Sequence, residues 1–149
     1  MNSKLKLFLF FILVALVASF GAYFKPGDWY LKLVKPTLIP PNWVFGPVWT
    51  VIYITIAISG WLIFSSQNLS LKLTWILQLI LNGIWSWIFF GLYRIDLALL
   101  DILALVTCVL IMTIISFKNL KPVFWLSIPY LIWVSYATFL NASIWFYNR

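Results

Sequence analysis

Amide and aromatic side chains share one face of an apolar stretch in the middle of the chain. At 3.6 residues per turn, Gln78, Asn82, Trp85 and Phe89 fall within about 60° of one another on a helix. Aromatic rings stack on flat apolar surfaces, and amides supply a small number of hydrogen bonds. This combination is typical of a pocket that holds a large, flat, apolar ligand.

Two other apolar stretches carry similar faces, one spanning about 80° and the other about 40° of a helix. A plainer alternative is that the amides tie helices together by hydrogen bonds worth about 0.6–2 kcal/mol each, and that the rings fill the core. The residues alone leave both interpretations open. The faces consist of Tyr130, Trp133, Ala137 and Asn141 in the later stretch and of Trp49, Tyr53 and Gly60 in the earlier one.

The inventory of reactive residues excludes several kinds of chemistry. The sequence has no His and no Glu, so it cannot form His-based zinc sites, Ser-His-Asp triads or a catalytic pair of glutamates, and we expect no metal site. With Cys108 as the only cysteine, no intrachain disulfide can form. We expect Asp96 to cap a helix with Arg94 as its partner, and Asp101 to pair with a neighbouring helix.

The composition is that of a membrane protein. Apolar residues make up 64% of the chain and charged residues 9%, whereas soluble domains have roughly 45–50% and about 25%. The net charge of +7 is spread singly between apolar runs instead of clustering on one face. The charges therefore suit lipid headgroups, and we expect the lipid bilayer and no nucleic acid as a partner.

Five apolar stretches are long enough to cross a bilayer as helices, which takes about 20 residues each. None alternates as a membrane strand does, so we predict an all-α membrane protein. The first stretch also resembles a cleavable signal peptide, but its apolar run is longer than the usual 7–15 residues. Short connections favour one antiparallel five-helix bundle over residues 1–149. The predicted spans are residues 5–24, 45–65, 71–93, 97–117 and 123–146.

The connection over residues 25–44 differs from the others because prolines and aromatic residues crowd it. Proline lowers the entropy lost on ordering, so we predict a shaped lid over one mouth of the bundle. Ala15, Ala18, Ser19 and Ala22 form a small face on the first span, which could pack inside the bundle or against a second copy. Five Lys or Arg lie at each end, so the positive-inside rule gives no orientation. The aromatic and proline residues of the loop are Pro26, Trp29, Tyr30, Pro36, Pro40, Pro41 and Trp43.

Several motifs, in order along nearly the whole chain, resemble those of the translocator protein family, also called the tryptophan-rich sensory proteins or peripheral benzodiazepine receptors. The motifs are Phe24 to Tyr30, Lys35-Pro36, Pro40-Pro41-Asn42-Trp43, Phe45 to Tyr53, Leu81 to Trp85 through Phe89-Phe90-Gly91, and Pro129 to Trp133 through Ala137 to Asn141.

The resemblance implies a five-helix membrane protein, commonly a homodimer, that binds porphyrins such as protoporphyrin IX, benzodiazepine-type ligands and, in some members, sterols. It implies a receptor or translocator with a sensory or tetrapyrrole-homeostasis role, a porphyrin ligand and no required cofactor. The motifs and the helical faces together give the candidate ligand-binding residues Tyr30, Trp49, Tyr53, Asn82, Trp85, Phe89, Phe90, Trp133, Ala137 and Asn141.

An alternative from another class is an enzyme that degrades porphyrin in a light- and oxygen-dependent reaction. Trp49 and Trp133 match the tryptophans implied for that reaction in bacterial relatives and would be its catalytic residues. The sterol motif of animal members is imperfect here, because six residues separate Leu140 from Tyr147 where at most five are permitted. The chain also lacks the longer polar tail of animal members, so the resemblance implies a bacterial inner-membrane protein.

Overall fold

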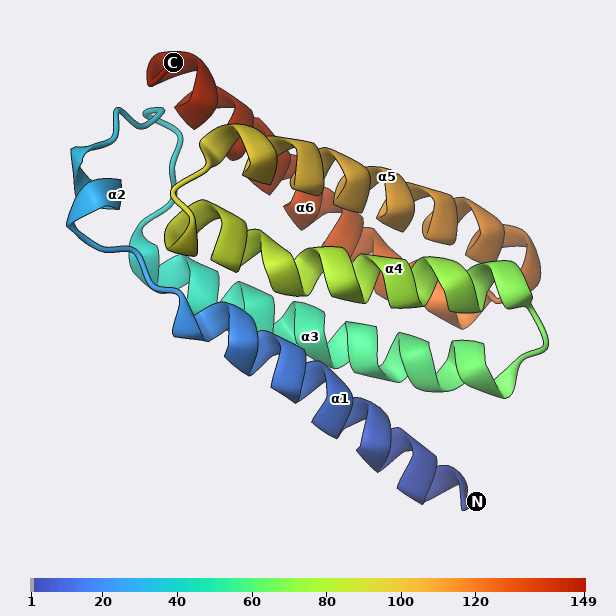
Figure 1. The fold of residues 1–149 in the computed structure, drawn as a ribbon. Helices are drawn as coiled ribbons and strands as arrows, with labels where there is room; N and C mark the ends of the chain where they lie inside the picture. The colour runs from blue at the N-terminus through green and yellow to red at the C-terminus, as the bar shows by residue number, and fades with distance from the viewer. Residues whose placement is uncertain (1) are drawn as a thin grey trace.

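The computed structural model describes residues 2–149, and helices make up nearly all of that part of the chain, with no strand. Backbone groups in lipid must be hydrogen-bonded within their own segment, which favours helices wherever the chain is apolar. Five helical segments are long and apolar enough to cross a membrane, which confirms the predicted fold class (Figure 1). They are α1 (Ser3–Tyr23), α3 (Asn42–Ser65), α4 (Leu69–Ser86) with its π-helical continuation η1 (Trp87–Gly91), α5 (Ile95–Asn119) and α6 (Lys121–Tyr147).

The helices begin close to the predicted positions, and local side chains account for two of the starts. The side chain of Asn2 accepts a hydrogen bond from the Lys4 N–H, and that of Asn68 accepts one from the Leu71 N–H at 3.0 Å, so that both cap a first turn. The largest difference is at α3, which begins at Asn42 rather than at residue 45. A short helix that was not predicted, α2 (Asp28–Lys32), lies inside the first loop.

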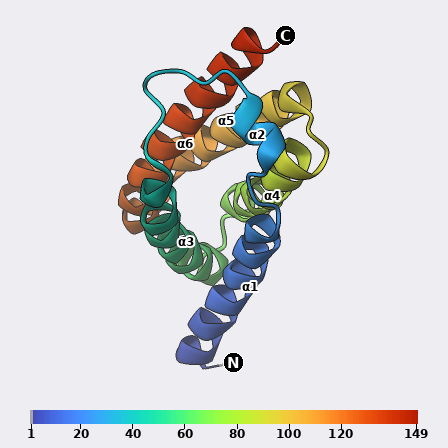
Figure 2. The same cartoon turned by 90° about the vertical axis from the view of Figure 1, so that its left-hand side faces the viewer.

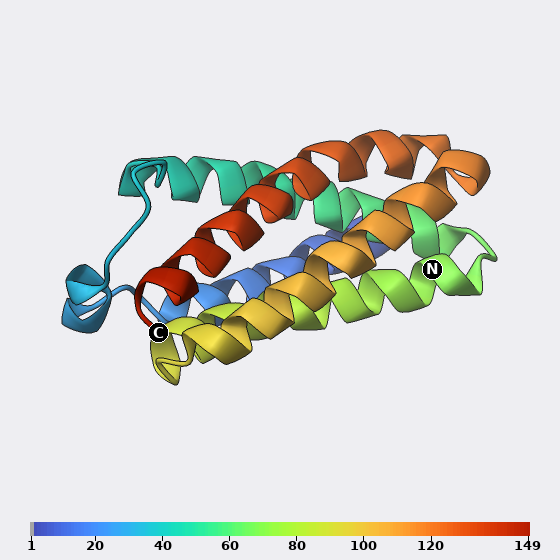
Figure 3. The same ribbon diagram turned by 90° about the horizontal axis from the view of Figure 1, so that it is seen from above.

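The spans form a closed ring in which α1 contacts α3, α3 contacts α6, α6 contacts α5, α5 contacts α4 and α4 contacts α1. Figure 2 shows the ring of helices viewed along the bundle, from the end that carries α2. The first loop, α2 and the C-terminus lie at one end of the bundle, and the N-terminus lies at the other (Figure 3).

The end nearer the N-terminus is tightly packed. The rings of Phe10 and Trp75 meet edge to face with centroids 5.2 Å apart, and the indole of Trp75 donates to the Ile56 carbonyl at 3.0 Å. Gly60 makes this approach possible, because a Cβ there would overlap the Trp75 ring and lie 2.7 Å from Phe10. Since this end is closed by packing, open space in the bundle is left at the loop end.

Candidate functional site

A cavity of about 840 Å³ lies inside the loop end of the bundle and reaches the loop itself. Its wall takes side chains from all five spanning segments. All ten residues that the sequence nominated for ligand binding line it: Tyr30, Trp49, Tyr53, Asn82, Trp85, Phe89, Phe90, Trp133, Ala137 and Asn141. The structure thus brings them together around one space, and their contact with a ligand stays a prediction.

The π-helix η1 supplies two adjacent rings to the cavity. The N–H of Leu92 donates to the carbonyl of Trp87, five residues earlier, at 2.9 Å, and this wider turn lets both Phe89 and Phe90 line the space. Phe89 stacks on Trp85 with centroids 5.0 Å apart and is almost fully buried. Tyr93, just beyond the π-turn, has a φ of 56°, which ends the segment.

The first loop covers the mouth through aromatic contacts made by α2. Trp29 and Tyr30 meet Phe89 with ring centroids 5.8 and 6.1 Å apart, and Tyr30 also meets Phe90 at 5.4 Å. The ammonium of Lys35 lies 4.6 Å from the centre of the Tyr30 ring. Burial of the phenol raises the pKa of Tyr30 above its ordinary value.

Two polar contacts tether the rest of the loop to α6. The hydroxyl of Tyr136 donates to the Leu38 carbonyl, and the side chain of Asn148 bonds both backbone groups of Val34. The loop is therefore fixed at Val34 and Leu38, in addition to the ring contacts that α2 makes with Phe89 and Phe90.

A row of buried polar groups lies at the deep end of the cavity. Tyr53 donates to Asn82 Oδ1 at 3.0 Å, and Asn82 Nδ2 donates to the Tyr130 oxygen at 3.0 Å. Tyr130 in turn donates to Gln78 Oε1 at 2.9 Å. Tyr53 and Asn82 line the cavity, whereas Tyr130 and Gln78 lie behind the wall and are almost fully buried.

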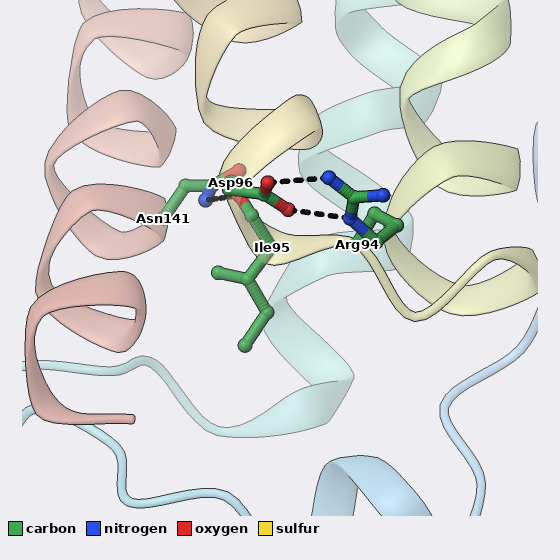
Figure 4. Close-up of polar contacts among 4 residues, drawn as sticks. All are labelled: Arg94, Ile95, Asp96 and Asn141. Atoms are coloured by element: carbon green, nitrogen blue, oxygen red, sulfur yellow. Dashed lines mark hydrogen bonds and ion pairs between the residues drawn. The ribbon is translucent and has the colours of Figure 1, made fainter. Parts of the chain in front are cut away.

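Asn141 ties three helices together on the other side of the cavity. Its Oδ1 accepts a hydrogen bond from the Trp85 indole at 3.0 Å. Its Nδ2 donates to the Ile95 carbonyl at 3.2 Å (Figure 4). Both interpretations of the amides therefore apply to Asn141, because it links helices and lines the cavity at once.

The two tryptophans nominated for redox chemistry differ in their surroundings. Trp49 stacks on Tyr53 with centroids 5.5 Å apart, while Trp133 meets Phe45 edge to face at 5.7 Å. The Trp133 N–H is buried and has no hydrogen-bond partner among residues 2–149. Trp133 also borders a shallower groove of about 530 Å³ on the outer side of α3 and α6.

Residues of α1 and the loop complete the wall, and the sequence had not assigned them to a site. The small face of α1 contributes Ala18, Ser19 and Ala22 to the lining, but Ser19 and Ala22 are exposed, so packing inside the bundle and packing against a second copy both stay open. Their small size leaves room that larger side chains would fill. Among the lining residues, Lys25 at the mouth is the only Lys, Arg, Asp or Glu.

Of the expectations for Asp96 and Asp101, the pairing of Asp96 with Arg94 is confirmed, whereas capping by Asp96 and pairing of Asp101 with a neighbouring helix were wrong. Helix α5 begins with Arg94 at the N-cap position, so Asp96 lies in the first turn and pairs with Arg94 through contacts of 2.9 and 2.7 Å (Figure 4). Asp101 was expected to pair with a neighbouring helix. Its buried Oδ2 instead has no hydrogen-bond partner in the part of the chain that the structure describes.

Comparison with known proteins matches nearly the whole chain to one family. The sequence model of the TspO/MBR family matches residues 9–146. The Rhodobacter capsulatus protein CrtK is 38% identical over 149 residues, which cover 93% of this chain and 90% of CrtK. The tryptophan-rich protein TspO of Archaeoglobus fulgidus is 37% identical, with 92% and 94% covered, and the human translocator protein is 33% identical, with 84% and 79% covered.

Proposed function

Because the chain belongs to the TspO/MBR family of membrane proteins, we propose that its cavity binds a porphyrin such as protoporphyrin IX, or another flat apolar molecule. The observation that carries this proposal is the cavity of about 840 Å³ that collects the ten nominated residues. A macrocycle offers two broad faces, which suit the rings of Trp49, Trp85 and Phe90. Stacking supplies most of the affinity, and a few polar groups fix the orientation.

The charge at the mouth suits the acidic end of such a ligand. Lys25 lines the cavity at the loop end, where the carboxylates of a porphyrin would remain near water. The sequence contains no His, so His ligation of haem iron is impossible and a metal-free porphyrin is the simpler ligand. We propose a sensory or tetrapyrrole-homeostasis role in a bacterial inner membrane.

We also propose that the protein forms a homodimer, as the family resemblance implies. The small face of α1 is the surface we propose for this contact, because Ala15, Ser19 and Ala22 are exposed and small residues let two helices approach closely. Chemical cross-linking in native membranes tests the proposal: a dimer band is expected, and monomer alone would contradict it.

Titration of the purified protein with protoporphyrin IX, followed through quenching of tryptophan fluorescence, tests porphyrin binding. The proposal expects saturable quenching at one porphyrin per chain. Quenching that rises linearly without saturating, as for a free tryptophan analogue in the same micelles, would contradict it.

Illumination separates the receptor from the alternative enzyme. A receptor returns intact porphyrin after exposure to light in air, whereas an enzyme consumes it at a rate that depends on Trp49 and Trp133. The enzyme remains the alternative function because Trp49 and Trp133 both border the cavity. Replacement of each tryptophan by Phe preserves stacking and removes the more easily oxidised indole.

A further inference from the structure

The hydrogen bonds of the buried polar row at the deep end of the cavity all run in one direction, from Tyr53 at the cavity wall to Gln78 behind it. Building on the proposed function, we infer that Tyr53 presents its oxygen to the cavity as a hydrogen-bond acceptor, so that the site prefers ligands with an N–H or O–H group at their deep end. The preference follows from four consecutive hydrogen bonds that start at a backbone carbonyl.

The direction is set at Gln78, on the side of the row away from the cavity. Gln78 Nε2 lies 3.0 Å from the carbonyl oxygen of Trp75, which can only accept. A reversed amide would place two acceptor oxygens against each other at a fully buried position, where water cannot separate them. The amide nitrogen of Gln78 must therefore face Trp75, and Oε1 must face Tyr130.

The same reasoning carries the direction to the next two residues. Since Gln78 Oε1 only accepts, Tyr130 must give its single hydroxyl proton to that oxygen, at 2.9 Å. The Tyr130 oxygen is then an acceptor toward Asn82, so Asn82 directs Nδ2 to it at 3.0 Å. Asn82 Oδ1 is thereby directed toward Tyr53.

The last bond of the row leaves Tyr53 without a free proton. Its hydroxyl donates to Asn82 Oδ1 at 3.0 Å, and a phenol has only one proton to give. What Tyr53 can still offer is a lone pair on its oxygen. Among the lining residues of α3 and α4, Tyr53 and Asn82 lie farthest from the loop, so this acceptor is at the deep end.

The cavity is consequently polarised along its length. The deep end offers the Tyr53 oxygen, and the mouth offers the ammonium of Lys25. The matching ligand is flat and apolar, carries a hydrogen-bond donor at one end and is acidic at the other. Trp133 also borders the cavity, and its buried N–H has no hydrogen-bond partner within residues 2–149, so a test must compare ligands across variants that keep Trp133.

Three tricyclic compounds of nearly equal shape provide the probe: carbazole carries a ring N–H, fluorene a CH₂ and 9-fluorenone a C=O. Each is used to displace protoporphyrin IX from the full-length protein in detergent. For wild type we expect carbazole to displace at about fivefold lower concentration than fluorene, the value of one hydrogen bond near 1 kcal/mol. Micelle partitioning is common to all variants, so it cancels when ratios are compared between them.

Tyr53→Phe removes the acceptor at the phenol oxygen, so the preference for carbazole over fluorene should fall about fivefold relative to wild type. Gln78→Leu frees the Tyr130 proton to turn toward Asn82, so the row can reverse and Tyr53 can donate instead. We expect this variant to shift preference from carbazole toward 9-fluorenone, an effect that simple loosening of the core does not produce. Tyr147→Phe and Gln67→Leu, at exposed positions outside the cavity, should keep the wild-type ratios.

The outcomes distinguish this inference from the function on which it rests. An unchanged carbazole-to-fluorene ratio in Tyr53→Phe that still binds protoporphyrin would overturn the inference, whether or not Gln78→Leu folds. Failure of carbazole to displace bound protoporphyrin would overturn it as well. Failure of protoporphyrin to bind wild type would instead overturn the proposed function.

Discussion

The side chain of Asn148 bonds the backbone of Val34 in both directions. Its Nδ2 donates to the Val34 carbonyl and its Oδ1 accepts from the Val34 N–H, each at 2.9 Å. These residues lie 114 positions apart in the sequence, so the contact fastens the first loop to the end of α6. The lid is thus closed partly by the last residues of the chain.

Asn148→Ala should loosen the lid without unfolding the bundle. Loss of the two bonds is expected to cost about 1 kcal/mol, and amide exchange at Val34 should quicken by about fivefold. Hydrogen exchange followed by mass spectrometry measures this directly. Asn119→Ala, which removes an amide that bonds only its own helix at the opposite end, should leave Val34 unchanged. Equal exchange at Val34 in wild type and Asn148→Ala would show that the clasp does not hold the loop.

Lys25→Gln should weaken binding of protoporphyrin IX by a few-fold, because an exposed ion pair is worth at most about 1 kcal/mol. The dimethyl ester of the same porphyrin has no carboxylate, so its affinity should not change. Lys32→Gln, in α2 and away from the cavity lining, is the matched control. An equal loss for acid and ester would assign Lys25 a role other than charge recognition.

Trp133→Ala should lower porphyrin affinity by about 1–3 kcal/mol, or roughly tenfold and more, because it removes a ring that lines the cavity. Trp145→Ala should have little effect, since Trp145 packs against Arg149 outside the cavity. Fluorescence titration of both variants checks this. Similar losses in two folded variants would remove the distinction between cavity and surface tryptophans.

Gly60→Ala should destabilise the closed end of the bundle, because its methyl group would overlap the Trp75 ring. Overpacking of this kind costs about 1–3 kcal/mol. Gly46→Ala lies in the same helix with no atom within 4 Å of the added carbon, so its stability should not fall. Thermal unfolding in detergent compares the two, and a Gly60→Ala midpoint at or above the wild-type value would contradict the packing described.

Much of the fold could be predicted because its determinants are local. Span length and hydropathy locate five helices, and a period of 3.6 places Asn82, Trp85 and Phe89 on one face. The short helix α2 was missed because five residues carry little helical preference of their own, and ring contacts with Phe89 and Phe90 hold it. The π-turn at Phe89 likewise has no periodic signal in the sequence.

The parts of the site that were missed depend on which helices become neighbours. The small face of α1 was visible in the sequence, but small residues suit a cavity wall as well as a helix contact, and the sequence does not show that α1 packs between α4 and α3 beside the cavity. Asp101 was expected to pair with a neighbouring helix, and the sequence does not show which side chains the fold brings beside it on α5. The role of Gln78 behind the wall also appears only when Tyr130 is placed beside it.

If ligand occupies the cavity enclosed by the spans and the lid, a larger side chain in the cavity wall must weaken binding. Ala18 lines the cavity, whereas Ala15, one turn earlier on α1, is exposed outside it. Each is replaced by Leu, and protoporphyrin IX binding is titrated by fluorescence quenching in samples with matched thermal stability. Ala18→Leu should weaken binding by tenfold or more because the added branch takes space from the ligand, while Ala15→Leu should bind like wild type. Equal affinity in the two variants would contradict binding in the cavity and would place the porphyrin elsewhere on the protein.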